Sequence, residues 1–162
     1  MFQYRDFTND PNTFPVGPGE AFLSRLHAQG QHYIPIVDSA LYIPNPYNAS
    51  DNYSIYWDGH ESGVWLQDGH GNEYIGDVWP GYTVFPDWHA EQSVPWWTRS
   101  MQGHHDRIPW DGIWLDMSEV SSFCYGSCGT GNLSLNPIHP PFSLPGEPGS
   151  VSFIRSSAPS AF

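Results

Sequence analysis

Lysine is absent from this sequence of 162 residues, and five arginines stand against seventeen acidic residues, so the formal net charge is −12. A surface of that charge repels a polyanion such as nucleic acid. No apolar run approaches the roughly 20 residues that span a bilayer, and no basic amphipathic segment offers a surface anchor. We therefore expect neither a nucleic-acid partner nor a membrane partner.

Cysteine is scarce as well, with Cys124 and Cys128 the only two. Their spacing suits a small disulfide loop in an oxidising compartment, and zinc is the alternative, although no second Cys/His pair stands in register. The run His104-His105-Asp106 also suggests a metal, but adjacent histidines point in different directions and no third ligand is suitably spaced. We predict a disulfide, a solvated loop at the histidines, and no metal or other cofactor.

The first residues lack the apolar stretch of a signal peptide. In contrast, three N-x-Ser/Thr sequons stand at Asn48, Asn52 and Asn132, and such sequons are glycosylated in secreted proteins. Together with the cysteine pair and the acidic balance, they predict a secreted glycoprotein whose true N-terminus precedes Met1.

Glycine, proline and aromatic residues are abundant, with 16 Gly, 16 Pro and 16% aromatic side chains. This composition indicates a folded, loop-rich protein with large buried rings. Residues 19–29 and 93–103 repeat apolar positions at helical spacing, whereas the short apolar runs 32–38 and 112–116 each end in an aspartate. Strands with acids at their carboxyl ends are typical of parallel α/β barrels. We expect residues 1–125 to form about two βα units of a (β/α)8 TIM barrel.

Residues 45–78 interrupt this alternation with turn signals and aromatic segments. The pattern predicts an inserted β-hairpin region with strands near 54–57 and 64–67. Residues 126–162 are rich in Gly, Pro and Ser without a period, which indicates an irregular loop extension whose end, 156–162, is unstructured.

Residues 111–119 read Asp-Gly-Ile-Trp-Leu-Asp-Met-Ser-Glu and resemble the signature of glycoside hydrolase family 31, Trp-x-Asp-Met-(Asn/Ser)-Glu. Further segments follow the family's order at about its spacing, at residues 4–8, 36–38, 75–81, 84–87 and 96–97. The resemblance extends over residues 1–148, and the stretch after the signature resembles the secreted fungal α-glucosidases of the family.

The resemblance implies that Asp116 is the nucleophile that forms a covalent glycosyl-enzyme intermediate, with Glu119 as a supporting residue. It also implies six positions that face the sugar being cleaved: Ile36, Asp38, Trp79, Trp114, Met117 and Phe123. The family's acid/base aspartate lies beyond Phe162, so we expect the rest of the barrel to be needed for a complete site and this piece alone to be inactive.

The expected activity is hydrolysis of terminal α-linked glucose from maltose-like oligosaccharides, by a retaining mechanism that needs two carboxyl groups about 5 to 5.5 Å apart. Other activities of the same family remain alternatives, namely α-xylosidase, transglucosidase and α-glucan lyase. A non-catalytic carbohydrate-binding fragment would also explain the aromatic content.

Overall fold

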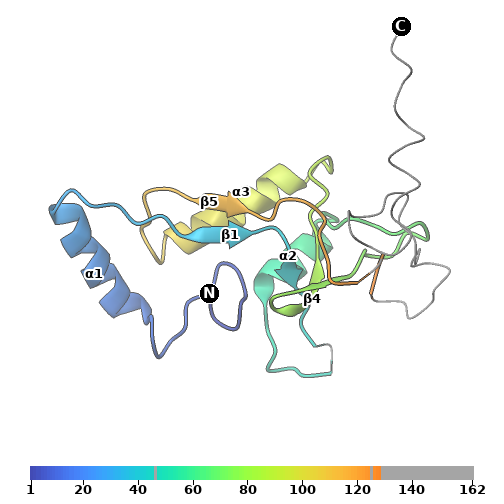
Figure 1. Ribbon diagram of the computed structural model, residues 1–162, viewed down its shortest axis with the longest axis horizontal. Helices are drawn as coiled ribbons and strands as arrows, with labels where there is room; N and C mark the ends of the chain where they lie inside the picture. The colour runs from blue at the N-terminus through green and yellow to red at the C-terminus, as the bar shows by residue number, and fades with distance from the viewer. Residues whose placement is uncertain (46, 125, 129–162) are drawn as a thin grey trace, which may run out of the picture.

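The computed structural model describes residues 1–45, 47–124 and 126–128 (Figure 1). The sequon at Asn132 and nearly all of the predicted loop extension, including 156–162, lie outside the described residues. Within the described part of the chain, no helix is long and apolar enough to cross a membrane.

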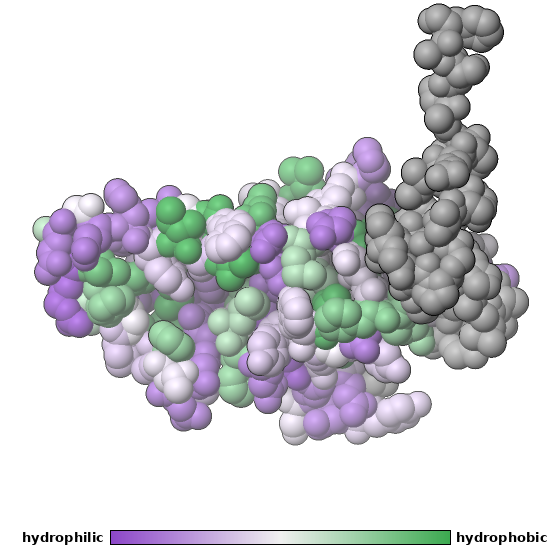
Figure 2. All heavy atoms as spheres, in the orientation of Figure 1, coloured by the Kyte–Doolittle hydropathy of each residue, from purple (hydrophilic) through white to green (hydrophobic). Residues whose placement is uncertain are grey.

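A parallel strand pair forms the frame of the fold. Strand β1 (Ile36–Asp38) and strand β5 (Trp114–Asp116) pair in parallel, which confirms both predicted strands. Helix α3 (Ser93–His105) precedes β5 and runs alongside the pair in Figure 1. Apolar surface gathers over the strand pair in Figure 2, and the side chain of Leu115 is 58% exposed. In the expected (β/α)8 barrel, neighbouring strands and helices cover surfaces of this kind.

The segment between β1 and α3 holds an antiparallel sheet in the order β2–β4–β3. Its strands are β2 (Leu41–Tyr42), β3 (Gly76–Val78) and β4 (Gly81–Val84). Of these three strands, only β3 lies within the predicted insertion at residues 45–78, at its end, and β2 and β4 flank it.

The predicted strand at residues 54–57 is wrong, because Ser54–Glu61 forms helix α2. Its aromatic residues have strand propensity, but the helix places the ring of Tyr56 stacked on that of Trp65, with centroids 6.0 Å apart. The Asp58-Gly59 pair, which suggested a turn, lies inside this helix. A Cβ atom on Gly59 would lie 2.2 Å from the Trp65 ring, so the missing side chain is what lets the indole pack there. Residues 64–67 form isolated bridges in place of a strand.

The core lies between α2, α3 and the inward face of β1. Trp96 of α3 is fully buried and meets Trp65 edge to face at 4.9 Å. Burial of rings of this size supplies much of the stability of a small loop-rich unit. The buried members of this cluster are Phe7, Val37, Leu41, Tyr53, Tyr56, Val64, Trp65, Val84 and Trp96.

Helix α1 (Val16–Ala28) confirms the first predicted helix, which begins three residues earlier than expected, at Val16 rather than Gly19. Helix α3 confirms the second but continues past Gly103 to His105.

The predicted solvated loop at the histidines is wrong. His104 is buried in the last turn of α3 and accepts the Trp110 indole N–H at 3.2 Å. Burial lowers the pKa of His104 to about 4, with the charge of Arg107 as a smaller cause.

Candidate active site

Four of the predicted site residues form two cross-strand pairs. Ile36 lies opposite Trp114, and Asp38 lies opposite Asp116. Because side chains alternate along a strand, these four share one face of the pair. Val37 points to the other face, where it packs in the core with α3. The two acids therefore stand side by side at the carboxyl ends of adjacent parallel strands, where barrel enzymes carry their catalytic groups.

Asp116 is half-buried, and the backbone N–H of Met117 donates to its Oδ1 atom at 2.9 Å. Met117 has φ of 48°, in the left-handed region that residues other than glycine seldom occupy. The hydroxyl of Ser39 donates to the Met117 carbonyl at 2.6 Å. The segment after β1 thus holds the tight turn after β5, and this turn fixes the orientation of the Asp116 carboxylate.

Asp38 is more enclosed than its neighbour, with 8% of its surface exposed. Burial raises the pKa of the Asp38 carboxyl, and the negative charge of Asp116 raises it further. Within the described residues its buried Oδ1 atom has no hydrogen-bond partner. A buried carboxylate oxygen without a partner is costly, because it has given up its hydrogen bonds to water without replacing them.

Sequence analysis missed one acid beside this pair. Asp6 is 2% exposed, and its Oδ1 atom accepts the backbone N–H of Asp38 at 3.1 Å. Burial raises the pKa of Asp6 to about 7, the hydrogen bond from Asp38 opposes that rise, and the Asp38 charge adds to it. The segment at residues 4–8 was noticed for its family pattern, but nothing local indicates that its aspartate is buried against a strand 32 residues away.

Three further predicted residues form an aromatic edge near the acids, which we call the Trp79 edge: Trp79, Met117 and Phe123. The Trp79 indole N–H points to the Met117 sulfur at 3.2 Å, and the rings of Trp79 and Phe123 meet edge to face at 5.6 Å. Both residues are more than half exposed, Trp79 by 56% and Phe123 by 67%.

A disulfide loop holds the Trp79 edge in place. Cys124 and Cys128 form the predicted disulfide, with Cα atoms 5.7 Å apart. Around it, the Phe123 N–H donates to the Asp77 carbonyl at 3.0 Å, and the Asp77 N–H donates to the Ser122 hydroxyl at 2.9 Å. The Cys128 N–H donates to the Ile75 carbonyl at 2.7 Å. The loop is therefore docked along β3, next to the turn that carries Trp79.

A cavity of about 200 Å³ borders Asp116 and extends along the face of the strand pair opposite Asp38. Val37, Leu115 and Trp97 line it, and the first two belong to the face opposite Asp38. The cavity thus lies toward α3. Glu119, which follows the turn after β5, is exposed, and Asn48 and Asn52 are exposed elsewhere on the surface. The supporting role of Glu119 and the glycosylation of the two asparagines stay predictions.

Comparison with known proteins supports the family suggested by the signature. The profile described as the glycosyl hydrolases family 31 TIM-barrel domain matches residues 1–146. An α-glucosidase of Aspergillus niger is 56% identical over 151 residues, which cover 93% of this chain and 15% of that protein. Glucoamylase 1 of Candida albicans is 54% identical over 145 residues, 89% of this chain and 15% of that protein.

Among solved structures, the family 31 α-glucosidase from Bacteroides thetaiotaomicron matches with a TM-score of 0.58 and 30% identity, over 75% of this chain and 19% of that one. The chain thus spans about 15% of the length of the relatives named above. The signature around Asp116, the profile match and these relatives agree, and the chain belongs to glycoside hydrolase family 31, as part of its TIM-barrel domain.

Proposed function

We propose that this chain is the nucleophile-bearing part of a retaining α-glucosidase that releases terminal glucose from maltose-like oligosaccharides. The observation that carries the proposal is the place of Asp116, half-exposed at the carboxyl end of β5 beside Asp38. Retaining glycosidases need an ionised carboxylate at such a position, rigidly held and open to a substrate.

In the proposed reaction, the Asp116 carboxylate attacks the anomeric carbon of the terminal glucose. The bond from that carbon to the leaving oxygen breaks, and a carboxyl group from outside this chain gives the oxygen its proton. Water then attacks the glycosyl-enzyme ester from the other side, gives its proton to the same outside group, and frees Asp116. The net configuration at the anomeric carbon is retained.

The neighbouring residues supply binding in this proposal. The Asp38 carboxylate at the end of β1 accepts a sugar hydroxyl, and the rings of Trp79 and Trp114, which are 56% and 59% exposed, pack against the C–H faces of the sugar ring. Apolar walls with a few placed polar groups are the usual construction of small-molecule sites. A transglucosidase, an α-xylosidase or a lyase would use the same nucleophile, so the products identify the activity.

The test uses the full-length protein with maltose and maltotriose. Asp116→Ala should lower kcat by at least about 10³-fold, and added azide should restore turnover and give β-glucosyl azide, because the small anion attacks from the vacated face. The matched control is Glu61→Gln, which changes an exposed acid on α2 and should leave kcat unchanged. Full activity in Asp116→Ala would end the proposal.

We also propose that the protein is secreted and N-glycosylated. The disulfide and the exposure of Asn48 and Asn52 support this. Removal of N-glycans from the protein recovered from culture medium should lower its mass and convert the occupied asparagines to aspartates, and an unmodified intracellular product would contradict it.

A further inference from the structure

Asp6, an acid that the family signature does not include, lies next to the end of β1, where Asp38 stands beside Asp116. Asp6 is buried, with 2% of its surface exposed. It reaches the site through the backbone, because its Oδ1 atom accepts the N–H of Asp38 at 3.1 Å. Asp38 is the last residue of β1 and lies opposite Asp116.

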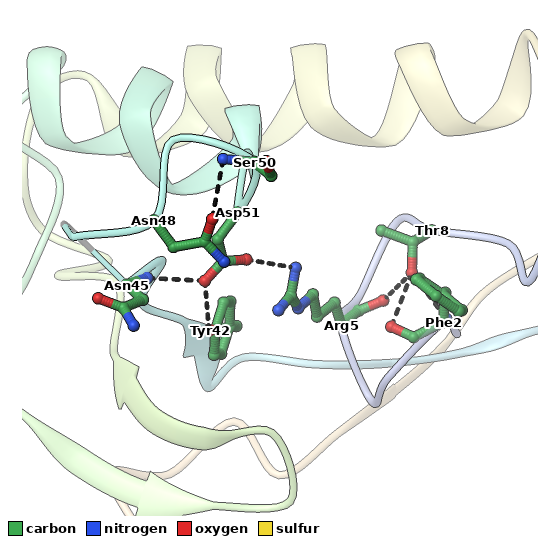
Figure 3. Close-up of polar contacts among 8 residues, drawn as sticks. All are labelled: Phe2, Arg5, Thr8, Tyr42, Asn45, Asn48, Ser50 and Asp51. Carbon is green, nitrogen blue, oxygen red and sulfur yellow. Dashed lines mark hydrogen bonds and ion pairs between the residues drawn. The ribbon is translucent and has the colours of Figure 1, made fainter.

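The loop that carries Asp6 is anchored on both sides of this residue, as Figure 3 shows for Arg5 before it and Thr8 after it. Arg5 pairs with Asp51 at 2.8 Å and lies 3.9 Å over the ring of Tyr42. The Tyr42 hydroxyl donates to the same carboxylate at 2.7 Å. The Thr8 hydroxyl closes the loop by donating to the Arg5 carbonyl at 2.5 Å.

The backbone on and after Asp6 is held as well. The Tyr53 hydroxyl donates to the carbonyl of Asp6 at 3.0 Å, and the Arg107 guanidinium donates to the carbonyl of Phe7 at 2.9 Å. These contacts come from the insertion and from the segment just after α3, so two separate parts of the chain hold the backbone around Asp6. Burying an acid in this way is costly, which a purely structural loop contact would not require.

We propose that Asp6 is a positioning residue for the sugar-binding carboxylate of Asp38. By accepting the Asp38 N–H, it fixes the carboxyl end of β1 and so the direction in which the Asp38 side chain faces the substrate and Asp116. The inference rests on the proposed function, since it concerns how the same site binds glucose.

The test is a double-mutant cycle in the full-length enzyme with maltose. Asp6→Ala removes the acceptor and should raise KM with a smaller change in kcat, lowering kcat/KM by about 10-fold. Asp6→Asn keeps an oxygen that can accept the N–H and should restore most of that loss. Asp38→Asn should raise KM in the same way, and adding Asp6→Ala to it should cost little more, because the second change acts through the first.

The matched control is Asp10→Asn, which changes an exposed acid of the same segment whose Oδ1 atom accepts the backbone N–H of Asn12 at 2.8 Å. It should leave both KM and kcat unchanged. Equal KM values for Asp6→Ala and wild type, or independent effects of Asp6→Ala and Asp38→Asn that multiply, would overturn the inference. These outcomes are distinct from a failure of the proposed function, which shows as activity that survives Asp116→Ala.

Discussion

The buried carboxyl of Asp6 makes stability depend on pH in a direction that is unusual for an acid. Its pKa rises from the ordinary 3.8 to about 7, chiefly because of burial. Between these values the folded protein holds a proton that the unfolded chain releases, so stability falls as pH rises. At about 1.4 kcal/mol per pH unit, the full displacement corresponds to about 4 kcal/mol. The stabilisation that comes from the raised pKa of Asp6 is therefore fully present below about pH 4 and is lost as pH rises past about 7.

The buried imidazole of His104 makes stability depend on pH in the opposite direction. Its pKa falls from 6.5 to about 4, because the imidazole is buried and Arg107 is near. In that window the unfolded chain binds the proton instead, so stability rises with pH, by about 3 kcal/mol. In the wild-type protein the two groups nearly offset each other between about pH 4 and pH 6.5, so a single wild-type profile does not reveal either of them.

The variant Asp6→Asn isolates the acid. It keeps the oxygen that accepts the Asp38 N–H and removes the titration. Thermal melts of full-length wild type and variant should give similar stability near pH 4, with the variant becoming more stable by up to about 4 kcal/mol near pH 8. Asp10→Asn is the control in the same part of the chain, because a hydrogen bond from the Asn12 N–H lowers the pKa of that exposed acid. A difference in stability between Asp6→Asn and wild type that does not change with pH, or a wild type that is the more stable of the two at high pH, would refute the reasoning.

Three further predictions concern stability and binding. Gly59→Ala should destabilise the protein by about 1 to 3 kcal/mol in thermal melts, because the added Cβ atom would lie 2.2 Å from an atom of the Trp65 indole. Gly103→Ala, which also lies in a helix but has open space around it, should instead stabilise the protein by up to about 1 kcal/mol. Replacing Cys124 and Cys128 by serine should cost about 2 kcal/mol of stability and raise KM for maltose, and a reductant should reproduce both effects in wild type but not in the variant. Trp79→Ala should lower kcat/KM by about 10-fold through KM, and an unchanged KM would place this ring outside the sugar site.

The strand ends were predictable from the sequence because the signal for them is local. Apolar runs that stop at Asp38 and Asp116 indicate strands that end in an acid, and the cysteine spacing indicates the disulfide. Helix α2 was not predictable from the pattern, because its aromatic residues favour strands and its Asp58-Gly59 pair favours a turn. The helix forms because Tyr56 and Trp65 stack in a shared core. The role of Asp6 was not predictable from the sequence, because its hydrogen bond to the site comes from the backbone of Asp38, 32 residues away.

The covalent bond to Asp116 is the claim on which the account depends. Full-length enzyme incubated with an activated fluoroglucoside and digested at low pH should yield one peptide heavier by a fluoroglucosyl group, with fragmentation that assigns the label to Asp116. Wild-type enzyme that is mixed with excess maltose before the fluoroglucoside is added should carry less label, because maltose competes for the same site. The Asp116→Asn variant should carry no label. A label on another carboxylate, or retained activity in an enzyme that is never labelled, would contradict the account.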